Sequence, residues 1–374
     1  MKERVEYLDI LKAAAIFLVV YCHFVLLSET VGANLCMSAC WAAVPVFFMV
    51  NGALLFKRPL DLRKHVRKTV GVYLVLVAWK CVYLLVIPPL TGGNIRGNGI
   101  WAILNYLFLF GELPEIINGH LWFIEALLAV YLVFPLLRAA GDWPLGRQEE
   151  GSAAGGNGRK LLWMVAVLSL LCTNGLYSLS VLGEMLRRAG IPFGLSFDAL
   201  AAFQPFGKYG NMLGFFLLGA LMESGQGRLR RSPFARRVFG TVLLAAGLFS
   251  LWGVKWFLSR RPEWDGVLLQ EGYRHLPVIL MAVGLFWICQ DVRIRQKWLS
   301  AGIRAVASRT LGIFYIHWIF GWMLTNPLAG WLVSHGISFG VWTNLLKNIV
   351  LIVPAFAATL ILEKIPVVRK LTTG

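Results

Sequence analysis

Charged side chains are scarce in this sequence. Asp, Glu, Lys and Arg make up 15% of its 374 residues, whereas soluble domains carry about 25%. A further 58% of the chain is hydrophobic. Because so few charged residues cannot cover the surface of a soluble globule of this length, the composition excludes a soluble protein and indicates an integral membrane protein.

The chain also lacks the cysteine patterns that build metal sites or disulfide frameworks. Its six cysteines lie almost wholly in apolar stretches and form no Cys-x-x-Cys pair. We therefore expect neither structural zinc nor disulfides, and no metal site. No internal repeat is visible, which argues against the inverted-repeat architecture of many secondary transporters.

Apolar runs long enough to cross about 30 Å of hydrocarbon recur along the chain. They cover residues 8–28, 34–56, 68–88, 120–138, 161–182, 209–223, 234–258, 275–291, 309–330 and 341–363. The sequence thus predicts an all-α, polytopic membrane helix bundle with about ten transmembrane helices. The shorter segment 99–110 is expected to form an interfacial or re-entrant helix.

Basic residues are distributed unevenly between the two sides of this bundle. With a cytoplasmic N-terminus, the inner loops hold clusters such as KRPLDLRKHVRK (57–68) and GRLRRSPFARR (227–237), and the outer loops hold far fewer. The positive-inside rule then places both termini in the cytoplasm. Topology and contact with anionic headgroups account for the net charge of +17, so nucleic-acid binding is not expected.

A single membrane domain, residues 1–374, is the simplest domain organisation. The segment GSAAGGNG (151–158), rich in Gly with Ser and Asn, predicts a flexible cytoplasmic linker near residues 147–160. The first apolar stretch is interrupted by His23 and is soon followed by a second span, so we interpret it as an uncleaved helix rather than a signal peptide.

Two ionisable residues, Lys12 and His23, mark the first apolar stretch. On a continuous helix they would lie about three turns apart, within roughly 20° of one face and roughly 16 Å along the axis. Because ionisable groups are costly inside a bilayer, the pair indicates a buried pathway, and His23 is a candidate base. Asp9 can pair with Lys12. The structural alternatives are a lysine that extends to the interface and a packed histidine.

A second histidine, His120, opens the fourth predicted span. It lies beside Trp122 at the outer boundary, where aromatic anchoring is the structural alternative. The predicted topology puts His120 in the same leaflet as His23, and Glu125 lies about 7 Å deeper. These positions predict a shared outward-facing site.

Further polar residues occur within the spans. Asn51-Gly52 permits either close helix packing or ligand contact. His317 lies about 12 Å inside the ninth span and can be structural. Lys80 and Lys347 either pair with buried acids or extend to the interface.

Five stretches of the chain resemble the integral-membrane acyltransferase family often called acyltransferase 3. They are YLDILKAAAIFLVVYCHF (7–24), VPVFFMVNGALLF (44–56), NGHLWFIEALLAVYLVFPLL (118–137), YGNMLGFFLLGALM (209–222) and SRTLGIFYIHW (308–318). They occur in the family's order, each in a different predicted helix, and together span nearly the whole chain. The resemblance implies about ten transmembrane helices. It also implies acyl transfer, commonly of acetyl from acetyl-CoA, to envelope glycans, lipid-linked sugars or antibiotics.

The resemblance also implies roles for single residues. The family's first helix carries an arginine followed by a histidine about three turns later, and Lys12 and His23 stand at these positions. Lysine keeps a charge that can hold a CoA phosphate but lacks the bidentate guanidinium. His120 fits the family's His-Leu-Trp block, and Asn51 stands where the family usually has serine.

Together the residues and the resemblance predict a multi-pass acyltransferase of the plasma membrane, with an O-acetyltransferase as the simplest case. Acyl-CoA is expected as co-substrate, not as a permanently bound cofactor, and an envelope glycan or lipid-linked sugar as acceptor. His23 would take a proton from the acceptor hydroxyl or be acylated itself, and His120 or Glu125 would orient the acceptor. The expected donor-binding residues are Lys12, Asp9, Asn51 and His317.

Two other classes of protein remain open. A transporter or flippase of a polysaccharide or lipid-linked glycan also needs polar residues in its helices, although no repeat or pair of broken helices supports it. A membrane domain that senses or anchors a partner is disfavoured because no soluble domain is attached. The His-x4-Asp motif of glycerolipid acyltransferases follows none of the histidines, so that enzyme class is not supported.

Overall fold

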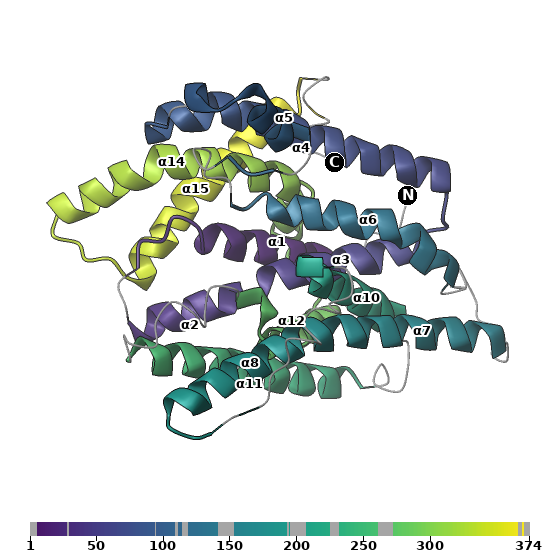
Figure 1. Cartoon of the computed structure of the whole chain (residues 1–374). Helices are drawn as coiled ribbons and strands as arrows, with labels where there is room; N and C mark the ends of the chain where they lie inside the picture. The colour runs from purple at the N-terminus through teal and green to yellow at the C-terminus, as the bar shows by residue number, and fades with distance from the viewer. Residues whose placement is uncertain are drawn as a thin grey trace. The chain divides into compact units, whose positions relative to one another are not determined.

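A computed structural model provides the coordinates of the chain (Figure 1). It describes residues 6–27, 30–93, 95–108, 111–113, 119–140, 153–192, 194, 207–224, 232–260, 272–365 and 369. Every regular element within these residues is a helix, and they contain no strand. The all-α fold predicted from the sequence is confirmed.

Six helical segments of the described chain are long and apolar enough to cross a membrane. They are Val31–Phe56, Leu62–Thr91, Trp122–Ala140, Asn157–Arg188, Pro233–Leu258 and Val341–Leu362. The other predicted spans are also occupied by helices, namely α1 (Glu6–Tyr21), α10 (Gly210–Ser224), α12 (Leu276–Gln290) and α14 (Thr310–Ser334). A count of about ten spans and cytoplasmic termini stay predictions.

The internal contacts divide the chain into two units. Unit 1 comprises Met1–Ala15, Asn34–Leu60 and Val133–Arg293, and unit 2 comprises Ile16–Ala33, Asp61–Leu132 and Ile294–Gly374. Helices α1 and α6 (Trp122–Ala140) contribute residues to both.

The linker expected near residues 147–160 falls only partly within the described chain. Residues 147–152 lie outside it, whereas α7 (Ala153–Leu170) begins at Ala153, so residues 153–160 are helical. The Gly-rich composition predicted a flexible segment there, but in the structure these residues form the first turns of a helix that continues into an apolar span.

In unit 1, two helices pack with their backbones in close approach. These are α3 (Ala43–Phe56) and α10. A Cβ atom on Gly219 would lie 2.0 Å from the carbonyl oxygen of Met49, and one on Gly52 would lie 1.8 Å from that of Phe216. Only glycine fits at either position, as is common where membrane helices pack tightly. Of the two interpretations of Asn51-Gly52, the structure supports close packing for Gly52.

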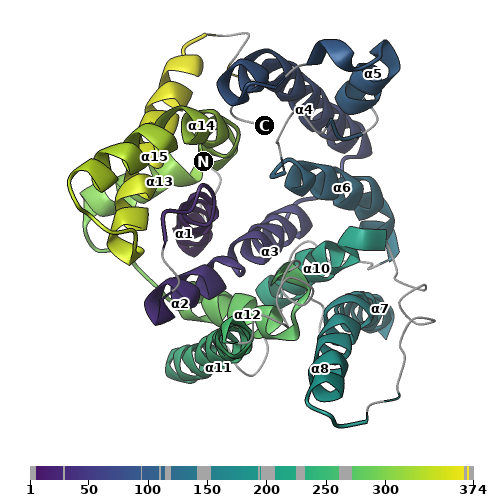
Figure 2. The same cartoon turned by 60° about the vertical axis from the view of Figure 1, so that its left-hand side comes forward.

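The remaining helices of unit 1 form adjacent pairs. Helix α11 (Pro233–Ser259) packs along α12, and α7 packs against α10 (Figure 2). Helix α8 (Leu176–Arg188) continues from α7 through a short π-helical segment, Leu171–Gly175.

Unit 2 contains α4 (Leu62–Thr91), α5 (Ile100–Phe108), α13 (Lys297–Ala307), α14 and α15 (Val341–Leu362). Helix α14 packs against both α15 and α4, and α5 lies against α4 (Figures 1 and 2). The short helix expected within residues 99–110 is therefore present as α5.

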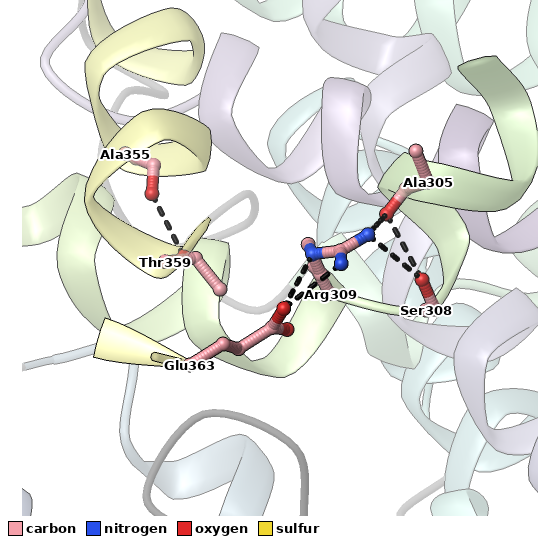
Figure 3. A network of polar contacts seen from close by, with 6 residues as sticks. All are labelled: Ala305, Ser308, Arg309, Ala355, Thr359 and Glu363. Atoms are coloured by element: carbon pink, nitrogen blue, oxygen red, sulfur yellow. Dashed lines mark hydrogen bonds and ion pairs between the residues drawn. The ribbon is translucent and has the colours of Figure 1, made fainter. Parts of the chain in front are cut away.

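An ion pair joins α14 and α15 at one end (Figure 3). The Nε and Nη2 atoms of Arg309, which precedes α14, lie 3.0 and 2.8 Å from Oε2 of Glu363, which follows α15. Arg309 also donates to the carbonyl of Ala305, 3.1 Å away. This guanidinium thus ties α13, α14 and α15 together.

Because α3 and α10 approach closely at Gly219, replacing this glycine with alanine should lower stability more than the same change at Gly253 on α11. Gly219→Ala would place its Cβ against the backbone of Met49, which cannot yield without separating the helices, so we expect a loss of about 1–3 kcal/mol in stability. Gly253→Ala on α11 is the matched control, because no heavy atom of a neighbouring described residue lies within 4 Å of its added Cβ. Thermal unfolding in detergent measures both; equal melting temperatures would contradict the packing described.

Candidate functional site

The first helix ends earlier than the sequence predicts. Helix α1 stops at Tyr21, and the chain turns through Cys22, His23 and Phe24, the last with a φ of 50°. His23 therefore lies in a turn beyond the helix, and the expectation that a continuous helix carries Lys12 and His23 on one face is wrong. The physical cause is the set of side chains that take the carbonyl groups at this helix end.

Two side chains of α15 bind the end of α1. The ammonium of Lys347 donates to the carbonyls of Val20, Tyr21 and His23, at 3.1, 3.0 and 2.7 Å. The amide of Asn344 donates to the carbonyl of Tyr21 at 3.0 Å. Both side chains are fully buried. Because they satisfy carbonyls that the helix has left unpaired, the helix can end without exposing polar backbone.

The unusual backbone of Phe24 is held by α14. Its ring packs on Trp318 and Trp322, with ring centroids 4.8 and 5.4 Å apart. A Cβ on Gly321 would lie 2.1 Å from this ring, so the absence of a side chain at Gly321 creates the space for it. Packing of the ring on these tryptophans offsets the cost of a left-handed conformation in a residue other than glycine.

Three histidines from distant parts of the chain meet in unit 2. Nδ1 of His23 lies 3.0 Å from Nε2 of His317. The ring of His120 lies 6.2 Å from that of His23 and 5.6 Å from that of His317, centroid to centroid. His120 and His317 are buried, and His23 is half-buried. His317, expected on the donor side, is thus a direct partner of His23.

With both rings taken as neutral imidazoles, the hydrogen bonds assign the tautomers of His317 and His23. Nδ1 of His317 lies 3.0 Å from the carbonyl oxygen of Ile313, which only accepts, so Nδ1 carries the proton. Nε2 of His317 therefore accepts from Nδ1 of His23. This leaves Nε2 of His23 unprotonated, with no donor from the described residues.

The same reasoning assigns His120. The hydroxyl of Tyr83 donates to the carbonyl of Tyr315 at 2.7 Å, so it accepts from Nε2 of His120 at 3.0 Å. Nδ1 of His120 is then unprotonated, and it is buried without a partner among the described residues. A buried acceptor of this kind calls for a donor such as a ligand hydroxyl or water. The ring itself stacks on Trp318, with centroids 4.2 Å apart.

Glu125 pairs with a lysine rather than with a histidine. Its Oε1 lies 3.0 Å from Nζ of Lys80, which is 1% exposed and lies 5.2 Å from the ring centre of Tyr106. Lys80 is thus a buried partner of an acid, one of the two alternatives open from the sequence. The role of Glu125 beside the histidines stays a prediction.

The remaining expected residues belong to unit 1, whereas the histidines belong to unit 2. Asp9 is buried and Lys12 is half-buried. The amide of Asn51 donates to the carbonyl of Phe47, one turn earlier in its own helix, at 2.9 Å. Donor binding by these residues stays a prediction.

For Lys347, the sequence left open pairing with a buried acid or extension to the interface, whereas the structure buries it on three backbone carbonyls. Asn344 and Tyr83 were not singled out from the sequence. A usable signal exists on α15, where Asn344, Lys347 and Asn348 recur at a spacing that places them on one face of an otherwise apolar helix. Tyr83 gives no such signal, because tyrosine is common in membrane helices. Among the described residues, no group of His, Cys, Asp and Glu could hold a metal ion.

A family model described as an acyltransferase domain matches residues 5–364, nearly the whole chain. The protein belongs to the acyltransferase 3 family. No curated protein and no solved structure gives a significant match. Membership assigns this acyltransferase-family chain to acyl transfer in general, and its long apolar helices agree with a multi-pass membrane protein.

Because Lys80 and Glu125 form an ion pair in this acyltransferase, the stability losses caused by replacing each of them should not add. Glu125→Leu removes the carboxylate from a lysine that is almost fully buried, so we expect a loss of about 3 kcal/mol. Lys80→Met should cost less, because the remaining carboxylate is 23% exposed. The double variant should be more stable than Glu125→Leu alone, as measured by thermal unfolding in detergent. Losses that simply add would show that the two charges are not coupled.

Proposed function

We propose that this protein transfers an acyl group, acetyl in the simplest case, from acyl-CoA to a hydroxyl of an envelope glycan or lipid-linked sugar. It would act in the plasma membrane, with about ten spans and both termini in the cytoplasm. The observation that carries the proposal is the unprotonated Nε2 of His23, fixed by His317 and neighboured by His120, in a chain of an acyltransferase family.

His23 supplies the proton transfer in this proposal. Its Nε2 takes the proton of the acceptor hydroxyl as the oxygen attacks the thioester carbonyl, forming the C–O bond. The C–S bond then breaks, and the thiolate of CoA receives the proton from the imidazolium. The hydrogen bond from Nδ1 to His317 orients the ring and stabilises the imidazolium. In a variant of this scheme, Nε2 attacks the thioester carbonyl and the thiolate of CoA leaves. The acceptor hydroxyl then attacks the acyl group, the N–acyl bond breaks, and the hydroxyl proton passes to the thiolate.

His120 is proposed to position the acceptor. Its unprotonated, buried Nδ1 can accept a hydrogen bond from a hydroxyl of the sugar, and Tyr83 and Trp318 hold the ring on its other sides. Glu125 would act indirectly, by neutralising Lys80 within the same unit.

The donor is proposed to enter from the cytoplasm as a co-substrate. Its phosphates would bind Lys12, with Asp9 beside it, and the basic inner loops, and Asn51 would contact the donor farther along. For His317, the hydrogen bonds to His23 and Ile313 favour a role in orienting His23 over one in holding CoA.

The first test compares His23→Ala with His335→Ala in purified protein. We expect His23→Ala to lower acyl transfer or acyl-CoA hydrolysis by about 10²–10⁴-fold, the usual contribution of a general base, with acyl-CoA binding unchanged. His335 is an exposed histidine of unit 2 and serves as the matched control, with activity retained. Release of the CoA thiol measures turnover, and calorimetry measures donor binding.

Normal turnover by a folded His23→Ala protein would exclude this mechanism. If the wild-type protein is inactive towards every acyl donor but moves a labelled glycolipid across proteoliposomes, the flippase function replaces the proposed one.

The second test removes the hydroxyl that sets the tautomer of His120. Tyr83→Phe leaves Nε2 of His120 without its acceptor, and we expect about a tenfold loss of kcat/KM for the sugar acceptor, with KM for acyl-CoA unchanged. Tyr73→Phe is the control, because Tyr73 lies on the same helix and donates to a backbone carbonyl, that of Phe108, at 2.7 Å. Steady-state kinetics with both substrates varied separates the two parameters. Equal effects of the two substitutions would argue against a role for Tyr83.

A further inference from the structure

The first turns of α15 bury polar side chains that the acyl-transfer scheme does not use. Asn344, Lys347 and Asn348 are fully buried, and Thr343 is 8% exposed. Burying an ammonium group is costly unless it is hydrogen-bonded on all sides, so the position of Lys347 requires a compensating environment. All these residues, and the groups that they bind, belong to unit 2.

This environment is the turn that contains His23. The three N–H donors of Lys347 bind three carbonyls, and the shortest contact, 2.7 Å, is to the carbonyl of His23 itself. Asn344 holds the turn from both sides, because its amide donates to Tyr21 and its oxygen accepts from the backbone N–H of Leu26 at 2.9 Å. The turn is therefore bound by α15 before, at and after the histidine.

A cation is well suited to this position. The carbonyls at a helix C-terminus carry partial negative charge and have no partners within the helix. An ammonium has three donors, which matches the three carbonyls that Lys347 contacts. A neutral amide such as glutamine could satisfy at most two of them.

The geometry couples the backbone of His23 to its side chain. Lys347 fixes its carbonyl from α15, while His317 fixes its Nδ1 from α14. The next residue, Phe24, is held in the space beside Gly321. With both ends of the residue bound, the direction of the unprotonated Nε2 is set by elements outside the turn.

We propose that Lys347 is the positioning residue of His23, and that it keeps the imidazole on His317 with Nε2 directed at the acceptor. This inference rests on the proposed function, because it takes His23 as the reacting histidine. It assigns to α15 a part in catalysis without contact to either substrate. A purely structural lysine would change the amount of folded protein but not the kcat of the folded fraction.

The test compares Lys347→Met, Lys347→Gln and Thr359→Val in detergent. We expect Lys347→Met to lower kcat by roughly 100-fold, as a misplaced reacting group does, with KM for acyl-CoA unchanged. Lys347→Gln, which keeps two donors, should recover part of the loss. Thr359→Val is the control, because it removes a buried hydrogen bond on the same helix, to Ala355 at 2.8 Å, that does not involve α1 (Figure 3).

The kcat is referred to the folded fraction, which size-exclusion chromatography and thermal unfolding measure for each variant. A Lys347→Met protein with wild-type kcat would overturn the inference, and so would a Lys347→Gln protein no more active than Lys347→Met. If Lys347→Met does not fold, Lys347→Gln alone carries the test, because it removes the charge and one of the three donors that bind the turn. We expect kcat to fall about tenfold, which would support the inference. A wild-type kcat would overturn it.

The parallel His23→Ala measurement keeps the two proposals separate. An inactive His23→Ala protein together with a fully active Lys347→Met protein overturns only the positioning role. An active His23→Ala protein overturns the proposed function whatever the result at Lys347.

Discussion

A helix that ends in a buried place leaves backbone carbonyls without water as a partner, and this applies to the end of α1 in unit 2, where Val20 and Tyr21 are buried. Lys347 and Asn344 of α15 supply the missing donors. They bind the carbonyls of Val20, Tyr21 and His23. The turn that carries His23 exists because these partners exist. The arrangement of the histidine cluster therefore depends on how the end of one helix is satisfied by another.

Two backbone carbonyls of α14 determine which nitrogens of the three histidines carry a proton. The carbonyl of Ile313 fixes the proton of His317 and, through it, that of His23. The carbonyl of Tyr315 orients the hydroxyl of Tyr83 and thereby fixes His120. Backbone carbonyls only accept hydrogen bonds and do not titrate, so they select which nitrogen of each neutral imidazole carries the proton.

The sequence predicted the helical fold and drew attention to His23 and His120, because ionisable residues stand out in apolar runs. It did not predict where α1 ends, because Cys22 and Phe24 continue the apolar pattern and the groups that end the helix lie more than 300 residues away. The Lys80–Glu125 pair shows the same limit. Each charge was visible in the sequence, but their contact depends on where the fold places two residues that are 45 positions apart.

The assembly of unit 2 from three separate segments, 16–33, 61–132 and 294–374, has a consequence for biosynthesis. The first helix emerges from the ribosome long before α15, so its carbonyls find their partners only after more than 300 further residues have been made. Long-range contacts of this kind form late and slowly. During membrane insertion the turn that carries His23 would thus stay unformed until α15 has been made, so the chemistry proposed for His23 could begin only after that point.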